Sequence, residues 1–185
     1  MGAVAARPDR FRAQRVASQH GFLATIELAN QFDHAPLKDL LELWRLKRNG
    51  RPMPRRSDIT LRDVRAHVGH IAVVDIIADP HLGRRYKLRL VGDSFSNTTG
   101  HRAAQYVDEA SDKGYGAVTT AVLDELFVHP CPLRFIGTPP RHDLEHVYAE
   151  SLLAPLSDDG SEPQQIMIAT WFSASPTGLS ATTAT

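Results

Sequence analysis

Apolar residues recur at helical spacing between residues 34 and 50. They fall at positions i, i+3, i+4 and i+7, which makes one apolar stripe on a helix. The stripe consists of Leu37, Leu40, Leu41 and Trp44. Pro36 suits the first turn of this helix, and Gly50 ends it. The stripe predicts a helix that covers an apolar surface, and its four residues are also the candidates for contact with a partner protein.

A second, shorter stripe follows a proline-rich connection. Thr60 can cap a short helix that carries Leu61, Val64 and Val68 on one face. We therefore expect a second amphipathic element just before the first strand.

From residue 70 onward the apolar period changes to two, or the run becomes continuously apolar, and both patterns are typical of strands. The segments with this pattern are residues 70–80, 84–92, 131–137, 146–156 and 164–174. Between the second and third of them lie a polar, turn-rich stretch and a long amphipathic helix that Pro130 ends.

This order of two strands, a helical excursion and three strands predicts an α+β fold with a five-stranded antiparallel sheet. The last strand is apolar on both faces, so both faces of the sheet need a cover. The excursion can cover one face, and the N-terminal amphipathic helix with Trp44 can cover the other.

Composition narrows the class of partner. The chain has 185 residues, 42% of them hydrophobic, with 21 basic and 21 acidic residues, so its formal net charge is zero. A neutral chain argues against binding of nucleic acid, and no apolar run is long enough for membrane insertion. Cys131 is the single cysteine, which fits a reducing compartment, the cytoplasm.

The two ends of the chain differ from its middle. Residues 1–35 are Arg-containing and lack a strong apolar pattern, so they are predicted to be a flexible extension. Residues 174–185 are small and polar, which is typical of a disordered tail. The predicted domain is therefore residues 36–173.

Several motifs in this domain resemble a known family. The segment "LLELWRLKRNGRPMPRRSDITLRDV" contains a tryptophan helix followed by Pro54, Arg56 and Asp58. The segments "VGHIAVVDI", "RRYKLRLVGDSFSNTTGHR" and "IATWF" continue the likeness. On these residues the chain resembles the PAS-like family found mostly in alphaproteobacteria, often as short stand-alone proteins.

The resemblance implies a PAS fold and a non-catalytic sensory or interaction module in signalling. The flanks are too short for a kinase, cyclase or DNA-binding segment, so we expect output through protein–protein contacts, with an unidentified signalling partner or a second copy in a homodimer. The turn-rich stretch "LVGDSFSNTTG" lacks a phosphate-binding motif. In a PAS fold it is where the second strand leaves the sheet, with Gly92 and Gly100 as turning points.

A small apolar ligand pocket is expected between the sheet and the excursion. Strand alternation and the PAS strand order suggest side chains from the second strand, the excursion and the last strand as its lining. The candidates are Tyr86, Leu88, Leu90, Phe95, Val118, Val122, Met167, Ala169 and Trp171. Tyr86 and Trp171 add a hydrogen-bonding group to their apolar area, which suits a ligand with one polar end. The alternative is that these side chains simply fill a packed core.

The sequence names no cofactor. His129 and Cys131 lie at the end of the long helix, where they could hold haem or a metal in a redox sensor. We favour a structural interpretation, in which His129 faces the helix C-terminus and Cys131 is a small apolar residue that begins a strand, so haem is not expected.

Other chemistry lacks the required spacing. The pairs His67 and His70, and His142 and His146, do not sit on one helix face as zinc ligands would. No nucleophile elbow or pair of catalytic carboxylates is present, so neither a metal site nor a hydrolase is expected.

Overall fold

The computed structural model of the chain describes residues 11–109, 113–139, 144 and 146–174. Its helices and strands, in chain order, are α1 (Arg12–Gln19), β1 (Ala24–Leu28), α2 (Ala35–Arg48), η1 (Arg56–Asp58), α3 (Leu61–Val64), η2 (Arg65–His70), β2 (Ile71–Asp79), β3 (Gly83–Val91), α4 (Asp93–Thr99), η3 (Val107–Glu109), α5 (Lys113–Val128), β4 (Leu133–Gly137), β5 (Tyr148–Leu156) and β6 (Gln165–Ser173). Here η marks a short 3₁₀ helix.

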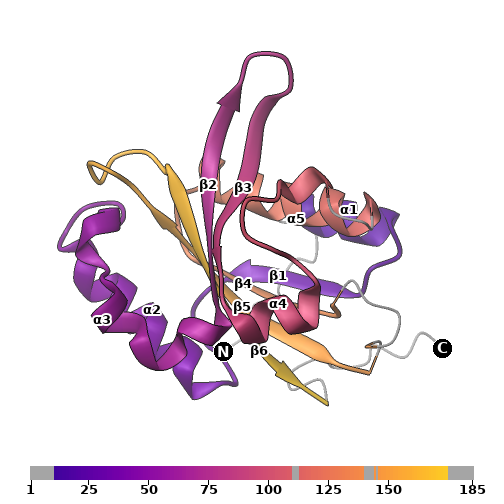
Figure 1. Cartoon of the computed structure of the whole chain (residues 1–185), viewed down its shortest axis with the longest axis horizontal. Helices are drawn as coiled ribbons and strands as arrows, with labels where there is room; N and C mark the ends of the chain where they lie inside the picture. The colour runs from indigo at the N-terminus through magenta and orange to yellow at the C-terminus, as the bar shows by residue number, and fades with distance from the viewer. Residues whose placement is uncertain (1–10, 110–112, 140–143, 145, 175–185) are drawn as a thin grey trace, which may run out of the picture.

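The strands form one antiparallel sheet in the order β1-β4-β5-β6-β2-β3. Strands β2 and β3 make a hairpin that projects beyond the body of the molecule (Figure 1). The predicted α+β class is confirmed, and each of the five predicted strands is present as β2 to β6. The sheet has a sixth strand, β1, which the sequence analysis missed.

The predicted flexible extension over residues 1–35 is wrong for residues 11–35. There α1 packs against α5, and β1 pairs with the edge of β4. The Gln14 side chain joins these two N-terminal elements, because its Nε2 donates to the Ala24 carbonyl and its Oε1 accepts from the Ile26 N–H. This segment is therefore part of the folded domain.

The outer ends of the chain are not described. Ala174 is the last described residue, so residues 1–10 of the predicted extension and residues 175–185 of the predicted tail lie outside the described residues.

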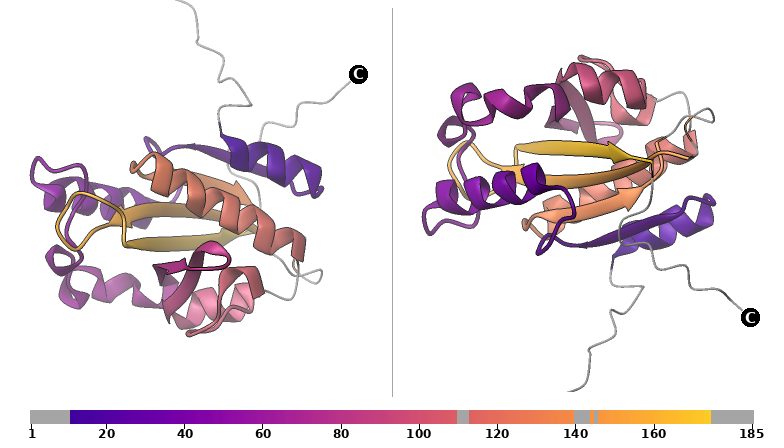
Figure 2. Two further views of the ribbon diagram at one scale, coloured as in Figure 1. Left: turned by 90° about the horizontal axis from the view of Figure 1, so that it is seen from above. Right: turned by 90° about the horizontal axis from the view of Figure 1, so that it is seen from below.

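Helices cover both faces of the sheet (Figure 2). On one face α1, α4 and α5 enclose a cluster that we call the α5-side core, and on the other α2 encloses the α2-side core. The α5-side core includes Tyr86, Leu88, Val118, Val122, Leu126, Ile166 and Ile168. The α2-side core includes Leu37, Leu40, Leu41, Trp44, Leu152, Met167 and Ala169. The predicted cover of both faces is therefore confirmed.

The Trp44 stripe is buried inside the chain. Its four side chains are at most 3% exposed, and the Trp44 Nε1–H donates to the Pro155 carbonyl at 2.8 Å. The proposal of Leu37, Leu40, Leu41 and Trp44 as partner contacts is therefore wrong for the folded chain. These residues hold α2 on β5 and β6 instead.

Two details of the strands determine which side chains reach the α5-side core. Between Val73 and Val74 the register of β2 and β3 shifts, so that Val73 lies opposite Leu90 and Val74 opposite Leu88. Arg89 is the extra residue of this β-bulge. Because a bulge reverses the alternation, Leu90 turns away from the face that Leu88 occupies.

In β6 the predicted face is wrong. Ile166 and Ile168 belong to the α5-side core, whereas Met167, Ala169 and Trp171 face α2. Both alternating sets of this strand are apolar, so alternation alone could not assign them to a face.

Candidate functional site

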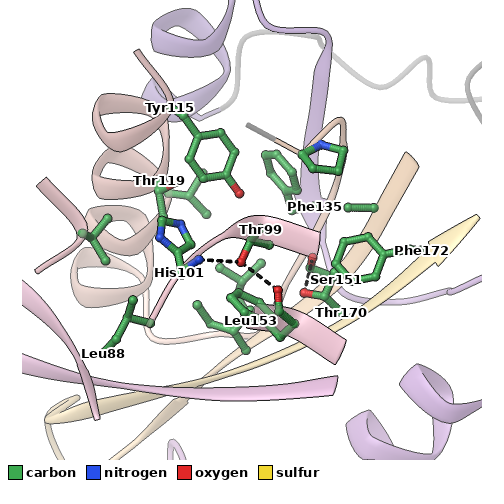
Figure 3. A pocket seen from close by; sticks show the side chains of 16 residues that line it. Leu88, Thr99, His101, Tyr115, Thr119, Phe135, Ser151, Leu153, Thr170 and Phe172 are labelled. Carbon is green, nitrogen blue, oxygen red and sulfur yellow. Dashed lines mark hydrogen bonds between the residues drawn. The ribbon is translucent and has the colours of Figure 1, made fainter. Parts of the chain in front are cut away.

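A cavity of about 60 Å³ lies between the α5-facing side of the sheet and helices α4 and α5 (Figure 3). Its lining residues are Leu88, Phe95, Thr99, His101, Val107, Tyr115, Thr119, Val122, Phe135, Pro139, Ala149, Ser151, Leu153, Ile168, Thr170 and Phe172. The cavity has room for roughly four to six water-sized groups, so it suits a small ligand or one end of a larger one.

The turn after β3 brings α4 to this cavity. Gly92 precedes α4, and a Cβ atom on it would lie 2.2 Å from the Val68 carbonyl oxygen. Only glycine permits this close approach of two backbone segments. Gly100 ends the helix with a φ of 77°, in the left-handed region that glycine adopts without strain. Both predicted turning points are present, and they aim Phe95 and Thr99 at the cavity.

His101 follows α4 and is 7% exposed. Its ring lies 6.4 Å from that of Phe95 and 5.8 Å from that of Tyr115, measured between centroids. Burial lowers the pKa of His101 from 6.5, so the imidazole is neutral at neutral pH. Among the described residues no hydrogen bond joins a ring nitrogen of His101, so the ring keeps a donor and an acceptor for a ligand.

Other polar groups lie around the cavity. Burial raises the pKa of Tyr115 to about 12, while a hydrogen bond with Thr119 acts in the opposite direction. The hydroxyls of Ser151 and Thr170 bond to each other at 2.8 Å across β5 and β6. An apolar cavity with a few converging polar groups is the usual form of a small-molecule site.

The structure brings only some of the predicted pocket residues together. Leu88, Phe95 and Val122 line the cavity. Tyr86 and Val118 are buried in the same core without lining it, and the Tyr86 hydroxyl donates to Asp124 at 2.6 Å.

The remaining candidates lie elsewhere. Leu90, Met167, Ala169 and Trp171 are on the α2-facing side of the sheet, for the reasons of bulge and alternation given above. Trp171 stacks on His70, with ring centroids 4.3 Å apart.

The polar lining residues were missed. Ser151 and Thr170 stand directly opposite each other in β5 and β6, but this pairing follows from the register of the two strands, which the sequence does not show. His101 gave no signal either, because only the fold shows that it is buried.

The two residues named for the haem alternative lie outside this cavity. His129 is exposed at the end of α5, Cys131 is half-buried, and neither lines the cavity. Within the described residues no group of three or more His, Cys, Asp or Glu side chains could hold a metal ion. No helix in the described part of the chain is long and apolar enough to cross a membrane.

Residues 32–169 match a family model described as a PAS domain. Solved structures also match, among them "Structure of an RNA-binding Light-Oxygen-Voltage Receptor", at 12% identity and a TM-score of 0.44, covering 81% of this chain and 38% of that one. This chain therefore spans less than half the length of that receptor. No curated protein matches.

Proposed function

The chain belongs to the PAS domain family, and we propose that it is a sensory module whose signal is a small molecule bound in the cavity beside His101. The observation that carries this proposal is a neutral, buried imidazole with unused hydrogen-bonding capacity at an apolar cavity. The ring nitrogens of His101 can pair with a polar atom of a ligand while the apolar lining contacts the rest of that ligand.

The lining favours a ligand without a full charge. No acidic or basic side chain other than the neutral His101 lines the described cavity, so a charged ligand would be desolvated without an ion-pair partner. A mostly apolar molecule with one hydrogen-bonding end fits this lining, and His101, Tyr115 and Thr119 are the groups at its polar end.

PAS domains are generally non-catalytic sensory modules. We propose that this chain likewise catalyses no reaction, acts in the cytoplasm, and passes its signal on through protein–protein contacts. The single cysteine and the neutral net charge support the proposed compartment and the absence of nucleic-acid binding.

A matched pair of substitutions tests whether the cavity is a ligand site. Ala149→Leu fills the cavity, whereas Ala169→Leu makes the same change on the packed, α2-facing side of the sheet. We expect Ala169→Leu to cost about 1–3 kcal/mol of unfolding free energy by overpacking, and Ala149→Leu to cost less than about 1 kcal/mol. Chemical denaturation of both variants measures the difference.

Equal destabilisation by the two substitutions would contradict the proposal. It would mean that the side chains around Ala149 are as tightly packed as those around Ala169, and the chain would then be a contact module without a ligand cavity.

A further inference from the structure

A large open groove lies on the α2-facing side of the molecule, away from the ligand cavity. Its volume is about 800 Å³, and it runs between the short helices η1, α3 and η2 and the strands β2, β3 and β6.

The groove wall is apolar although it faces solvent. Leu61 is 66% exposed, Leu90 38% and Val68 37%. Leu61 and Val68 belong to the amphipathic face of the short helix predicted from the sequence, and Val64 lies between them. The β-bulge at Arg89 turns Leu90 onto the same groove. Exposed apolar side chains that gather in one hollow indicate a binding surface.

The exposed, unpaired charges on the short helices η1, α3 and η2 are positive. Arg56, Arg62 and Arg65 are exposed, and no ion pair joins them to a carboxylate among the described residues. The neighbouring acidic groups are already in ion pairs with other residues, because Asp58 pairs with Arg51 and Asp63 pairs with Lys47. Of the charged residues that line the groove itself, Arg56 and Asp158 are in no ion pair among the described residues, and Arg89 pairs with Asp75.

We propose that this groove binds an amphipathic helix of a partner protein, with apolar residues on one face and acidic residues beside them. Leucine-sized side chains at i, i+3 or i+4, and i+7 would fill the apolar wall, and the acidic residues would meet the arginines of η1, α3 and η2. This proposal does not depend on whether the cavity holds a ligand.

Strand addition is a poor alternative. Strand β2 is paired on both sides, with β3 and β6, so its backbone groups are already used. The edge of β3 is partly covered, because Leu88 exchanges backbone hydrogen bonds with Ala104 and Gln105. A partner in the groove therefore makes contacts with side chains. A bound helix binds in this way, whereas an added strand would need free backbone groups.

A second copy of this chain is also disfavoured by charge. Leu46 is an exposed apolar residue of α2, and it lies near Arg48, which is in no ion pair among the described residues, while Arg45 pairs with Glu42 and Lys47 with Asp63. Inserting it into a groove flanked by arginines would bring like charges together. An acidic partner avoids this repulsion.

A peptide selection on the full chain tests the proposal. The probe is a displayed library of peptides about 16 residues long, with helical apolar spacing and random flanking charges. We expect the selected peptides to be rich in Asp and Glu, and to bind more weakly as salt rises. Leu61→Asp and Arg56→Glu should each raise the Kd by at least about tenfold. Leu46→Asp, outside the groove, is the matched control and should leave the Kd unchanged.

Three outcomes would overturn the proposal. The first is a selection that yields no peptide sensitive to Leu61→Asp. The second is a preference for basic or non-helical peptides. The third is a wild-type dimer in sedimentation that Leu61→Asp converts to a monomer, which would assign the groove to a second copy.

Discussion

His101 combines deep burial with a side chain whose charge changes near neutral pH. Its neighbours in the cavity are rings and hydroxyls, and the cause of its lowered pKa is burial alone. The folded state therefore prefers the neutral ring, while the unfolded chain takes up a proton at about the ordinary value of 6.5. The residue makes folding sensitive to acid.

The sign of this effect follows from proton binding. Below pH 6.5 the unfolded state binds more protons than the folded state, so the stability supplied by neutral His101 is present above that pH and is lost as pH falls below it. His101→Gln should reduce this loss of stability between pH 6.5 and the lowered pKa of the folded state. Urea unfolding of wild type and variant across that range is the measurement. Parallel curves for the two proteins would show that His101 does not titrate differently on folding.

The junction of β3, α4 and η2 is the element that connects the two sides of the molecule. Its centre is Gly92, whose N–H donates to the Ile71 carbonyl at 2.8 Å while its Cα faces the backbone of Val68 and Gly69. Helix α4 lines the cavity through Phe95, and η2 lines the groove through Val68. The two candidate sites therefore share one backbone contact.

Substitution of Gly92 tests this junction. In Gly92→Ala the new Cβ would meet backbone atoms at 2.2, 2.5 and 2.6 Å, so the two segments must separate, at a cost of about 3 kcal/mol. Gly100→Ala is the comparison, because it meets nothing within 4 Å and suffers only backbone strain of about 1–2 kcal/mol. Thermal unfolding of both variants should rank Gly92→Ala as the less stable. The reverse ranking would mean that the two backbone segments at the junction can separate at little cost in unfolding free energy.

Elements with strong local patterns were predictable from the sequence, and long-range choices were not. Helix α2 and strands β2 to β6 follow from periodicity, because a stripe or an alternation is a local property. Strand β1 was missed because it is short and is stabilised by pairing with β4, which lies far from it in the sequence. The side of the sheet to which each β6 side chain points depends on the order of the strands, and the side to which Leu90 points depends on a bulge. Neither can be predicted from a local sequence pattern.

At the scale of the whole molecule, one sheet separates two candidate sites. The cavity with His101 lies on the α5-facing side, and the groove with Leu61 lies on the α2-facing side. A PAS domain with a ligand site on one side and a partner site on the other has the parts that a sensory module needs.

We propose that the cavity holds a small molecule, and native mass spectrometry can detect such a complex. Wild-type chain and Ala149→Leu are incubated with the small-molecule fraction of the host cell and then measured under non-denaturing conditions. We predict a complex heavier than the bare chain for the wild type, and the bare chain alone for Ala149→Leu, whose added side chain occupies the cavity. The bare mass for both proteins, or an added mass that Ala149→Leu retains, would show that the cavity is not a ligand site.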